Sequence, residues 1–204
     1  MESPKQPDIT RAQILKAAFA EIHRHGFQAA SINNILADTG LTKGALYHHF
    51  PTKQALGLAV VDEVIKERFK LLFCEPLATS ARPVEALLEL VATIEHKLSP
   101  QFIELGCPLN NLIQEMSPLD EVFKQHLTGV LDMWRSTIEN ALRKGQRQGV
   151  IRPDVDCAAA TLFVIAALGG CRGVAKNLQS QEVFHACMQQ LHGYIAGLCI
   201  PGKS

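Results

Sequence analysis

The stretch Gly40-Leu-Thr-Lys-Gly-Ala-Leu-Tyr-His-His-Phe-Pro-Thr-Lys53 determines how the rest of the chain is interpreted. Thr42 is suited to cap the amino end of a short helix, and Pro51 stops that helix. Leu46 and Phe50 stand four residues apart and predict one buried face. The opposite face then carries small residues and hydrogen-bond donors, namely Lys43, Gly44, Ala45, Tyr47 and His48.

That outward face suits close contact with another molecule better than contact with solvent. Small residues allow a near approach, and amide, hydroxyl and amine donors can read base edges or phosphates in a DNA major groove. Thr52 can cap the following helix, which places Lys53 in its first turn. A cation there is electrostatically unfavourable for the helix itself. We therefore expect Lys53 to serve a phosphate outside the protein.

The residues before this stretch predict two supporting helices. From Ile9 onward apolar residues recur at helical spacing, and Gly26 ends the pattern. Ser31 can cap a second short helix, and Gly40 supplies the tight turn into the quoted stretch. A helix, a short helix, a glycine turn and another short helix together predict a helix-turn-helix with a supporting first helix.

The remainder of the chain has helical spacing throughout and no strand pattern. Apolar periodicity, Pro and Gly predict a helix from Lys53 that Pro76 ends, a helix from Pro83 to about Leu98, and a short helix that Pro108 begins. A long helix opens at Ser117-Pro118 and closes near Gly145 to Gly149, followed by helices over about 155–177 and 181–198. The predicted fold class is all-α, with about nine helices.

Composition limits the class of protein without naming its function. The 204 residues are 47% hydrophobic and 20% charged, enough apolar material to bury a real core. The formal net charge is zero, with six Lys and Arg against four Asp and Glu in residues 1–57. So weak a basic bias would not indicate nucleic-acid binding without the helix-turn-helix pattern.

The cysteines and the apolar runs bear on location. The first residues contain no apolar segment typical of a signal peptide, and the longest uncharged run, Cys157 to Cys171, has 15 residues, short of a bilayer span. None of the six cysteines forms a C-x-x-C pair. We therefore predict reduced thiols, a cytoplasmic protein without a membrane partner, no metal site and no cofactor.

The stretch Thr39-Gly-Leu-Thr-Lys-Gly-Ala-Leu-Tyr-His-His-Phe-Pro-Thr-Lys-Gln-Ala-Leu56 closely resembles the DNA-binding head of TetR-family transcriptional repressors. The upstream apolar pattern from Ile14 to Ile35 agrees, so the resemblance covers about residues 9–60. It implies a DNA-binding head over residues 1–52 and a helical ligand-binding and dimerisation domain over residues 53–204. It also implies a homodimer formed through the last two helices, which binds a near-palindromic double-stranded operator and a small-molecule effector.

The resemblance assigns roles within the head residue by residue. The positions that typically meet bases are Lys43, Gly44, Ala45 and His48, and those where phosphate contacts are usual are Thr42, Tyr47, His49 and Lys53. Asn33 matches a second-helix position that reaches a base or a phosphate in some members. The alternatives are that Tyr47 and His49 pack against the first helix and that the two lysines are ordinary solvated side chains.

On the effector side the resemblance implies a cavity among the middle helices. Candidate lining residues are Phe69, Phe102, Asn110, Asn111, Met133, Trp134 and Phe163, with Glu115 and Met116 also considered. The alternative for each aromatic residue is plain core packing, and the alternative for Asn110 and Asn111 is exposure to solvent. Trp134, the only Trp, is the leading candidate.

Cys107 differs from the other five cysteines in its predicted position. If Pro108 is the first helical residue, Cys107 is the cap, where helix dipoles favour a thiolate and a loop position keeps the sulfur reachable. A resemblance to electrophile-sensing TetR-like repressors points the same way. The alternative is a small residue that fills a helix junction.

The leading functional prediction is a repressor released from its operator by a small effector or a thiol-reactive signal. The alternative is an all-helical enzyme or an adaptor without DNA binding. The sequence has no G-x-S-x-G motif, phosphate-binding loop or metal-spaced cluster, so we predict no catalytic residues. A basic amphipathic face that would suit a membrane-surface adaptor is also missing from the head.

Overall fold

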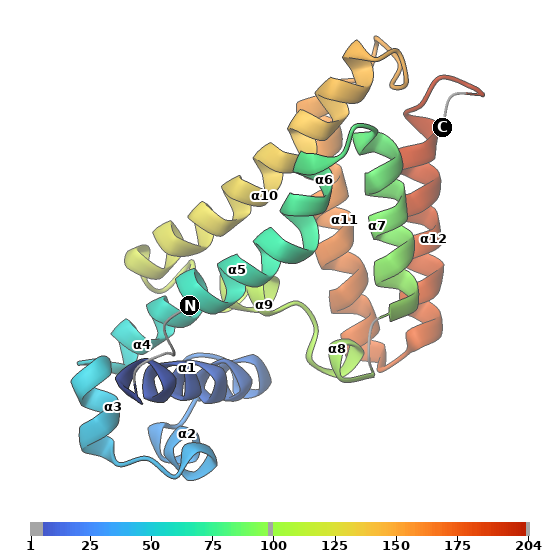
Figure 1. The fold of residues 1–204 in the computed structure, drawn as a ribbon. Coiled ribbons are helices and arrows are strands. Elements are labelled where there is room, and N and C mark those ends of the chain that lie inside the picture. The colour runs from blue at the N-terminus through green and yellow to red at the C-terminus, as the bar shows by residue number, and fades with distance from the viewer. Residues whose placement is uncertain (1–5, 98–99, 203–204) are drawn as a thin grey trace. The chain divides into compact units, whose positions relative to one another are not determined.

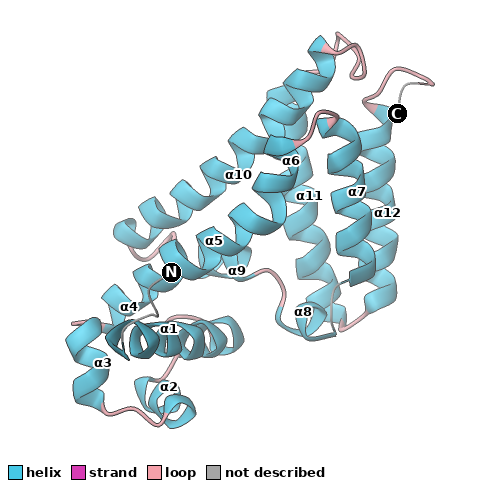
Figure 2. Ribbon diagram, in the orientation of Figure 1, coloured by secondary structure: helices cyan, strands magenta, loops and turns pink. Residues whose placement is uncertain are grey.

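The computed structural model describes residues 6–97 and 100–202, with the side chains of residues 10–95 and 103–202. Over these ranges the protein is built from helices joined by loops, as Figures 1 and 2 show. The one extended pairing in them is an isolated antiparallel bridge between Ile151 and Cys199. The all-helical prediction is confirmed. The first helices are α1 (Gln6–His25), α2 (Ile32–Thr39), α3 (Lys43–His49) and α4 (Lys53–Ala59).

The chain folds into two compact units, each of which takes two separate segments. The first unit is Met1–Arg68 together with Pro108–Val130, and the second is Phe69–Cys107 together with Leu131–Ser204. Helix α9 (Pro108–Met116) therefore lies in the first unit, with α1 to α4. Helix α10 (Glu121–Arg147) contributes residues to both units.

The predicted caps of the head helices are confirmed. The Ser31 hydroxyl accepts from the backbone N–H of Asn34 at the start of α2, and Thr42 accepts from Ala45 at the start of α3, at 3.2 Å. Gly40 closes α2 with φ +67°, a left-handed conformation that glycine adopts without penalty. Ile14 and Leu46 are fully buried in this unit, which shows that the short helices pack on α1.

The helix that starts at Lys53 does not end at Pro76, which corrects the sequence prediction. It continues through the π-helical segment η1 (Val60–Ile65), α5 (Lys66–Phe69), the π-helical segment η2 (Lys70–Cys74) and α6 (Glu75–Thr79). Pro normally clashes with the carbonyl four residues earlier. The wider turn of η2, in which Glu75 N–H bonds to the Lys70 carbonyl five residues back, precedes Pro76 and accommodates it at the start of α6.

The long helix α10 begins at Glu121, three residues after the predicted Ser117-Pro118 opening. Asp120 sets the start, because its Oδ1 accepts from the backbone N–H groups of Val122 and Phe123 at 2.9 and 3.1 Å. The hydrogen bond from Phe123 N–H is also the main reason that the pKa of Asp120 lies below its usual range. The helix begins after Asp120 and not at Ser117-Pro118, because the Asp120 carboxylate satisfies two backbone amides that would otherwise be unpaired.

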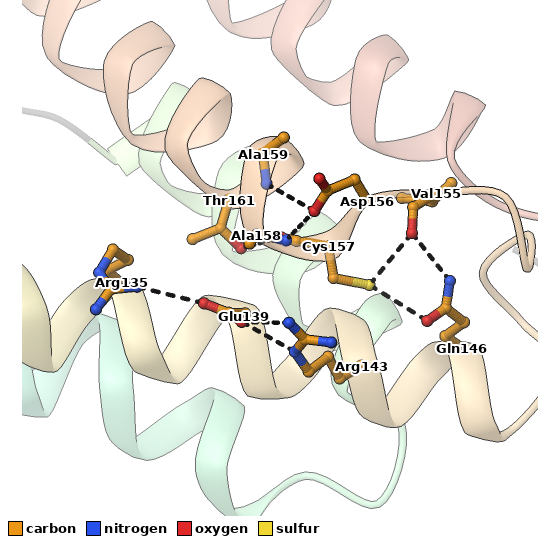
Figure 3. A network of polar contacts seen from close by, with 10 residues as sticks. All are labelled: Arg135, Glu139, Arg143, Gln146, Val155, Asp156, Cys157, Ala158, Ala159 and Thr161. Carbon is orange, nitrogen blue, oxygen red and sulfur yellow. Dashed lines mark hydrogen bonds and ion pairs between the residues drawn. The ribbon is translucent and has the colours of Figure 1, made fainter.

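The second unit contains α7 (Pro83–Lys97), α8 (Pro100–Leu105), α11 (Cys157–Leu178) and α12 (Gln181–Gly197), and α12 packs on both α7 and α11. Asp156 caps α11 by accepting from Ala158 and Ala159, as Figure 3 shows. Gln146 of α10 donates from Nε2 to the carbonyls of Arg152, Pro153 and Val155. These contacts fold the loop before α11 tightly, and burial raises the pKa of the adjacent Cys157 thiol.

One side of α11 is apolar and uncovered in the protomer. Its exposed residues recur at about four-residue spacing and include Leu162, Phe163, Ala166, Gly170, Gly173, Val174 and Leu178. Among the described helices, α11 alone has the length and composition to cross a membrane, with 22 residues and a mean hydropathy of 1.7. This is a weak indication, because helices in the cores of globular proteins meet the same criteria, and it does not indicate a membrane protein.

Candidate functional site

Helix α3 places most of its predicted DNA-contacting side chains on the surface. Leu46 and Phe50 are buried beneath it, while Lys43, Gly44, Tyr47 and His48 are exposed, Tyr47 by 44%. Thr42 and Asn33, predicted at the start of α3 and on α2, are exposed as well. Ala45 and His49 are half-buried, and the His49 ring lies 6.4 Å from that of Phe50. The arrangement presents donors and small residues on one face.

The buried side of α3 is held by a charged pair from other helices. The Arg11 guanidinium of α1 lies 4.9 Å from the centre of the Phe50 ring and donates two hydrogen bonds to the Glu63 carboxylate. Those hydrogen bonds are the main reason that the pKa of Glu63 lies below its usual range. Arg11 thereby joins α1, η1 and the end of α3.

Glu21 positions α2 on α1, a role that sequence reasoning missed. Its Oε1 accepts from the Ser31 backbone N–H at 3.0 Å and from Asn34 Nδ2 at 2.9 Å. The carboxylate is buried. A buried acid needs such partners, and its position beside Ile22 on the apolar side of α1 was the available signal.

Lys53 has partners within the protein, in addition to any role at a phosphate. Its Nζ donates to the Gln28 carbonyl at 2.9 Å and lies 5.1 Å from the centre of the Phe27 ring. The side chain is half-buried. The sequence prediction for Lys53 did not include this hydrogen bond to Gln28. The two residues stand 25 positions apart, and no local sequence pattern marks such a contact.

Glu115 of α9 binds the turn between α1 and α2. Its two carboxylate oxygens accept from the backbone N–H groups of Phe27 and Gln28 at 2.9 and 2.8 Å. Gly26 precedes them with φ +81°, and a Cβ on Gly26 would approach those oxygens to 2.9 Å. The sequence predicts Glu115 as a polar residue of the effector cavity, whereas its carboxylate accepts from two backbone amides.

The start of α10 makes three more contacts within the first unit. The Phe123 ring lies 4.5 Å from the Phe27 ring between centroids, and both rings pack against Gly57 of α4. Gln54 Nε2 donates to Asp120 at 2.7 Å. His126 Nδ1 lies 2.7 Å from an oxygen of Asp62 on η1. The segment 108–130 is therefore joined to the head by both apolar and charged contacts.

The predicted effector-side residues divide into interior and surface positions. Trp134 is 6% exposed, and its ring lies 5.2 Å from that of Phe69 and 5.3 Å from that of Phe73. Met133, Asn110 and Asn111 are half-buried, and the Phe102 side chain lies outside the described residues. Phe163 is 52% exposed and stacks on Tyr194 at 4.4 Å, which places it on the surface of α11 rather than in an interior wall of the protomer.

Cys107 precedes α9 as predicted, but the expectation that it is reachable is wrong. The side chain is 6% exposed, and residues 106–109 are all buried. Gly106 adopts φ +73°, and its burial together with Cys107 shows that this junction lies inside the protein. The described cysteines are all free, and burial, with a contribution from Cys187, raises the pKa of Cys171 to about 12.

Two other features of the described residues bear on possible sites, a surface groove and the arrangement of metal-binding residue types. An open groove of about 380 Å³ on the first unit is lined by Arg11, Ala12, Leu15, Lys16, Glu63, Val64 and Arg68. Two of its cations are already engaged, Arg11 with Glu63 and Arg68 over the Phe19 ring at 4.1 Å. Over the described residues no three His, Cys, Asp or Glu side chains are grouped so that they could hold a metal ion.

Comparison with known proteins supports a DNA-binding role for the segment that contains α3. A family model for bacterial regulatory proteins of the tetR family matches residues 14–60, and one for the tetracyclin repressor-like C-terminal domain matches residues 83–191. The chain belongs to the TetR family of transcriptional regulators. Members of this family bind DNA and are not enzymes, so the predicted fold, DNA-binding class and lack of enzymatic activity are confirmed.

Individual relatives support the same assignment. An uncharacterized HTH-type transcriptional regulator of Lactococcus lactis is 34% identical over 132 residues, which are 64% of this chain and 67% of the relative. The HTH-type transcriptional repressor DhaR of Mycobacterium sp. strain GP1 is 28% identical over 145 residues, 71% of each chain. The crystal structure of a TetR regulator from Chloroflexus aurantiacus is 27% identical and superposes with a TM-score of 0.83 over 95% of this chain and 98% of the other.

Proposed function

We propose that this regulator is a homodimeric repressor whose affinity for a near-palindromic operator falls when a small effector binds its helical domain. The observation that supports it best is the exposed face of α3, whose amino end is capped by Thr42 and whose underside is buried through Leu46 and Phe50. Operator binding and effector binding would act on one conformational equilibrium, so each must weaken the other by the same factor.

For the DNA, two copies would place their α3 helices in successive major grooves, about 34–36 Å apart. We propose that Lys43, Gly44, Ala45 and His48 meet bases, and that Thr42, Tyr47, His49, Lys53 and Asn33 meet phosphates or, for Asn33, a base. The proposed boundary between the DNA-binding head and the helical ligand-binding and dimerisation domain falls between residues 52 and 53. Segment 108–130, which is folded with the head, would transmit the response.

A gel shift on the DNA upstream of the protein's own gene tests whether α3 is the DNA-recognition helix. Lys43→Ala should relax preference at one base position, at a cost of about 1–3 kcal/mol. Lys53→Ala should weaken binding to all sequences alike and reduce the salt slope by about one. It should also lower the thermal midpoint, because Lys53 donates to Gln28 inside the head. If both variants bind as the parent does, α3 is not the DNA-recognition helix.

For the dimer, the uncovered stripe of α11 supports pairing of α11 and α12 with the same helices of a second copy, as a two-fold contact. A Cβ added at Gly170 or Gly173 would meet no other atom within 4 Å, so a leucine at either position would fit the protomer. The same leucine would keep two copies apart. Sedimentation should then show monomers and the gel shift a loss of tight binding. A parent protein that is monomeric at micromolar concentration would refute the arrangement.

The effector side and the location complete the proposal. We propose that Trp134 and Phe69 contact the effector, and that the protein works in the cytoplasm, as TetR-family regulators typically do. Because Cys107 is buried, a reversible ligand is favoured over a thiol-reactive signal. A mild electrophile that releases the operator from the parent but not from Cys107→Ser would restore the thiol mechanism.

A further inference from the structure

Two buried hydrogen-bond donors of the second unit have no partner among the described residues, Arg172 Nε and Trp134 Nε1. Arg172 is only 7% exposed. Buried donors are nearly always paired, and a guanidinium remains charged at any physiological pH. A buried donor without an acceptor is costly, so a group that is not part of the described chain is the natural partner for these two N–H groups.

Both donors border the same aromatic cluster. The Arg172 Cζ lies 6.0 Å from the centre of the Phe73 ring, and the Trp134 ring lies 5.3 Å from that same ring. Phe69 closes the cluster, 5.0 Å from Phe73 and 5.2 Å from Trp134. An apolar wall with a few polar donors at its edge is the usual composition of a small-molecule site.

Three acidic side chains of the second unit have other partners. Glu139 accepts from Arg143 and Arg135, as Figure 3 shows, Glu95 pairs with His185, and Asp154 pairs with Arg152. Over the part of the chain that the structure describes, no carboxylate accepts a hydrogen bond from Arg172 Nε. The Nε–H of Arg172 is therefore left without an acceptor beside the aromatic cluster.

The backbone beneath the cluster is itself irregular. Phe73 lies on the π-helical segment η2, and such turns are rare and occur frequently at functional sites. A π turn can return to α-helical spacing with a rotation of the side chains it carries. Phe73 is thus placed where it can move to admit a ligand without loss of the helix.

We propose that Arg172 and Trp134 form the anion-binding end of the effector site, and that the effector is a small organic carboxylate with an apolar body. The edge of a guanidinium offers two parallel donors that match a carboxylate, and Trp134 Nε1 supplies a further donor. The apolar body stacks on Phe69 and Phe73. A neutral amide of the same shape offers one acceptor oxygen and no negative charge, so it cannot match both donors and is rejected. This inference rests on the proposed function, since it names the chemical class of its effector.

The single Trp makes binding directly observable. The full chain, free of DNA and at constant ionic strength, is titrated with acetate, benzoate and 3-phenylpropionate, and with the neutral amide of each. We expect a saturable change in Trp134 emission with benzoate or 3-phenylpropionate and none with the amides. Arg172→Met should weaken that binding at least tenfold. No response to any carboxylate at about 10 mM, well above a weak Kd of about 1 mM, or an equal response to the amides, overturns the proposal.

A second measurement needs no ligand. Arg172→Met keeps a long apolar stem and removes the charge, so the unliganded variant should unfold at a temperature no lower than the parent. Arg135→Met, which removes a cation paired with Asp132 and Glu139, is the matched control and should lower the midpoint slightly. A fall of several degrees for Arg172→Met, larger than in the control, would mean that Arg172 has a partner inside the protein, and the proposal fails.

A gel shift on the same samples separates this inference from the proposed function. If benzoate binds through Arg172 but the parent shows no specific DNA binding, the repressor proposal fails and the anion site stands. If the parent binds its operator but no carboxylate binds, the anion site fails and the repressor proposal stands. Operator release by a carboxylate from the parent, and not from Arg172→Met, supports both.

Discussion

The two units differ in how completely their polar groups are paired. In the first unit the carboxylates of Glu21, Glu63 and Glu115 each accept two hydrogen bonds from other segments. In the second unit pairing is complete around Gln146 and Glu139, yet Arg172 and Trp134 each leave a buried N–H without a partner among the described residues. Satisfied groups specify one arrangement of a fold, whereas a buried unsatisfied group requires an explanation, which the proposed anion site supplies for Arg172 and Trp134.

The largest expected effect breaks the packing of the first unit. A Cβ on Gly57 would overlap the Phe27 ring and approach Phe123 Cζ to 2.7 Å, so Gly57→Ala should lower the free energy of unfolding by about 3 kcal/mol. Gly129→Ala on α10 has open space and should instead add about 0.5–1 kcal/mol. Thermal unfolding followed by circular dichroism compares them. Equal effects would show that Gly57 is not a close contact.

The next effect tests pairing in the first unit directly. Glu115→Ala leaves the amides of Phe27 and Gln28 without acceptors and should destabilise the protein by about 2 kcal/mol. It should also weaken operator binding, because the turn between α1 and α2 loses its support. Glu115→Gln should fall between, and the exposed neighbour Gln114→Ala should match the parent. Denaturant unfolding measures the stability of each variant, and a gel shift measures its operator binding. If Glu115→Ala behaves like the parent in both, the contact of Glu115 with the two amides does not stabilise the protein.

A smaller effect is expected at the periphery of the second unit. Gln146→Ala removes the donor to the carbonyls of Arg152, Pro153 and Val155, and should destabilise by about 1 kcal/mol since the lost donor is neutral. The exposed Asn140→Ala on the same helix is the control. If Gln146→Ala is destabilising while Arg172→Met is not, the contrast between paired and unpaired polar groups is supported. If both variants change stability alike, it is contradicted.

The smallest effect is a pH dependence. Hydrogen bonds from Arg11 hold the pKa of Glu63 below its usual value, so this carboxylate adds stability above its unfolded pKa and loses it as pH falls through the folded pKa. Below about pH 4.3 the midpoint of the parent should therefore fall more steeply than that of Glu63→Gln. Above that pH the two curves should stay parallel. Parallel curves at acid pH as well would contradict the stabilising role of the pair.

What the sequence alone determined is local and periodic. The caps at Ser31, Thr42 and Gly40, the buried pair Leu46 and Phe50, the all-helical class and the exposed α3 surface follow from residues a few positions apart. Such features can be identified from the sequence because a cap or a helix face involves only residues that are near one another along the chain. For the same reason the stretch around α3 sufficed to indicate the family, and nothing comparable marked residues 108–130 as part of the head.

Only the tertiary structure decided which distant side chains meet. Glu115 contacts an amide pair almost ninety positions earlier in the chain, Lys53 bonds to Gln28, Cys107 is buried, and Phe163 faces outward. The missing acceptor at Arg172 Nε is of the same kind, because it depends on which groups long-range packing brings beside it. Helical periodicity states that a residue lies on a face but not what covers that face, and burial and pairing are set by long-range packing.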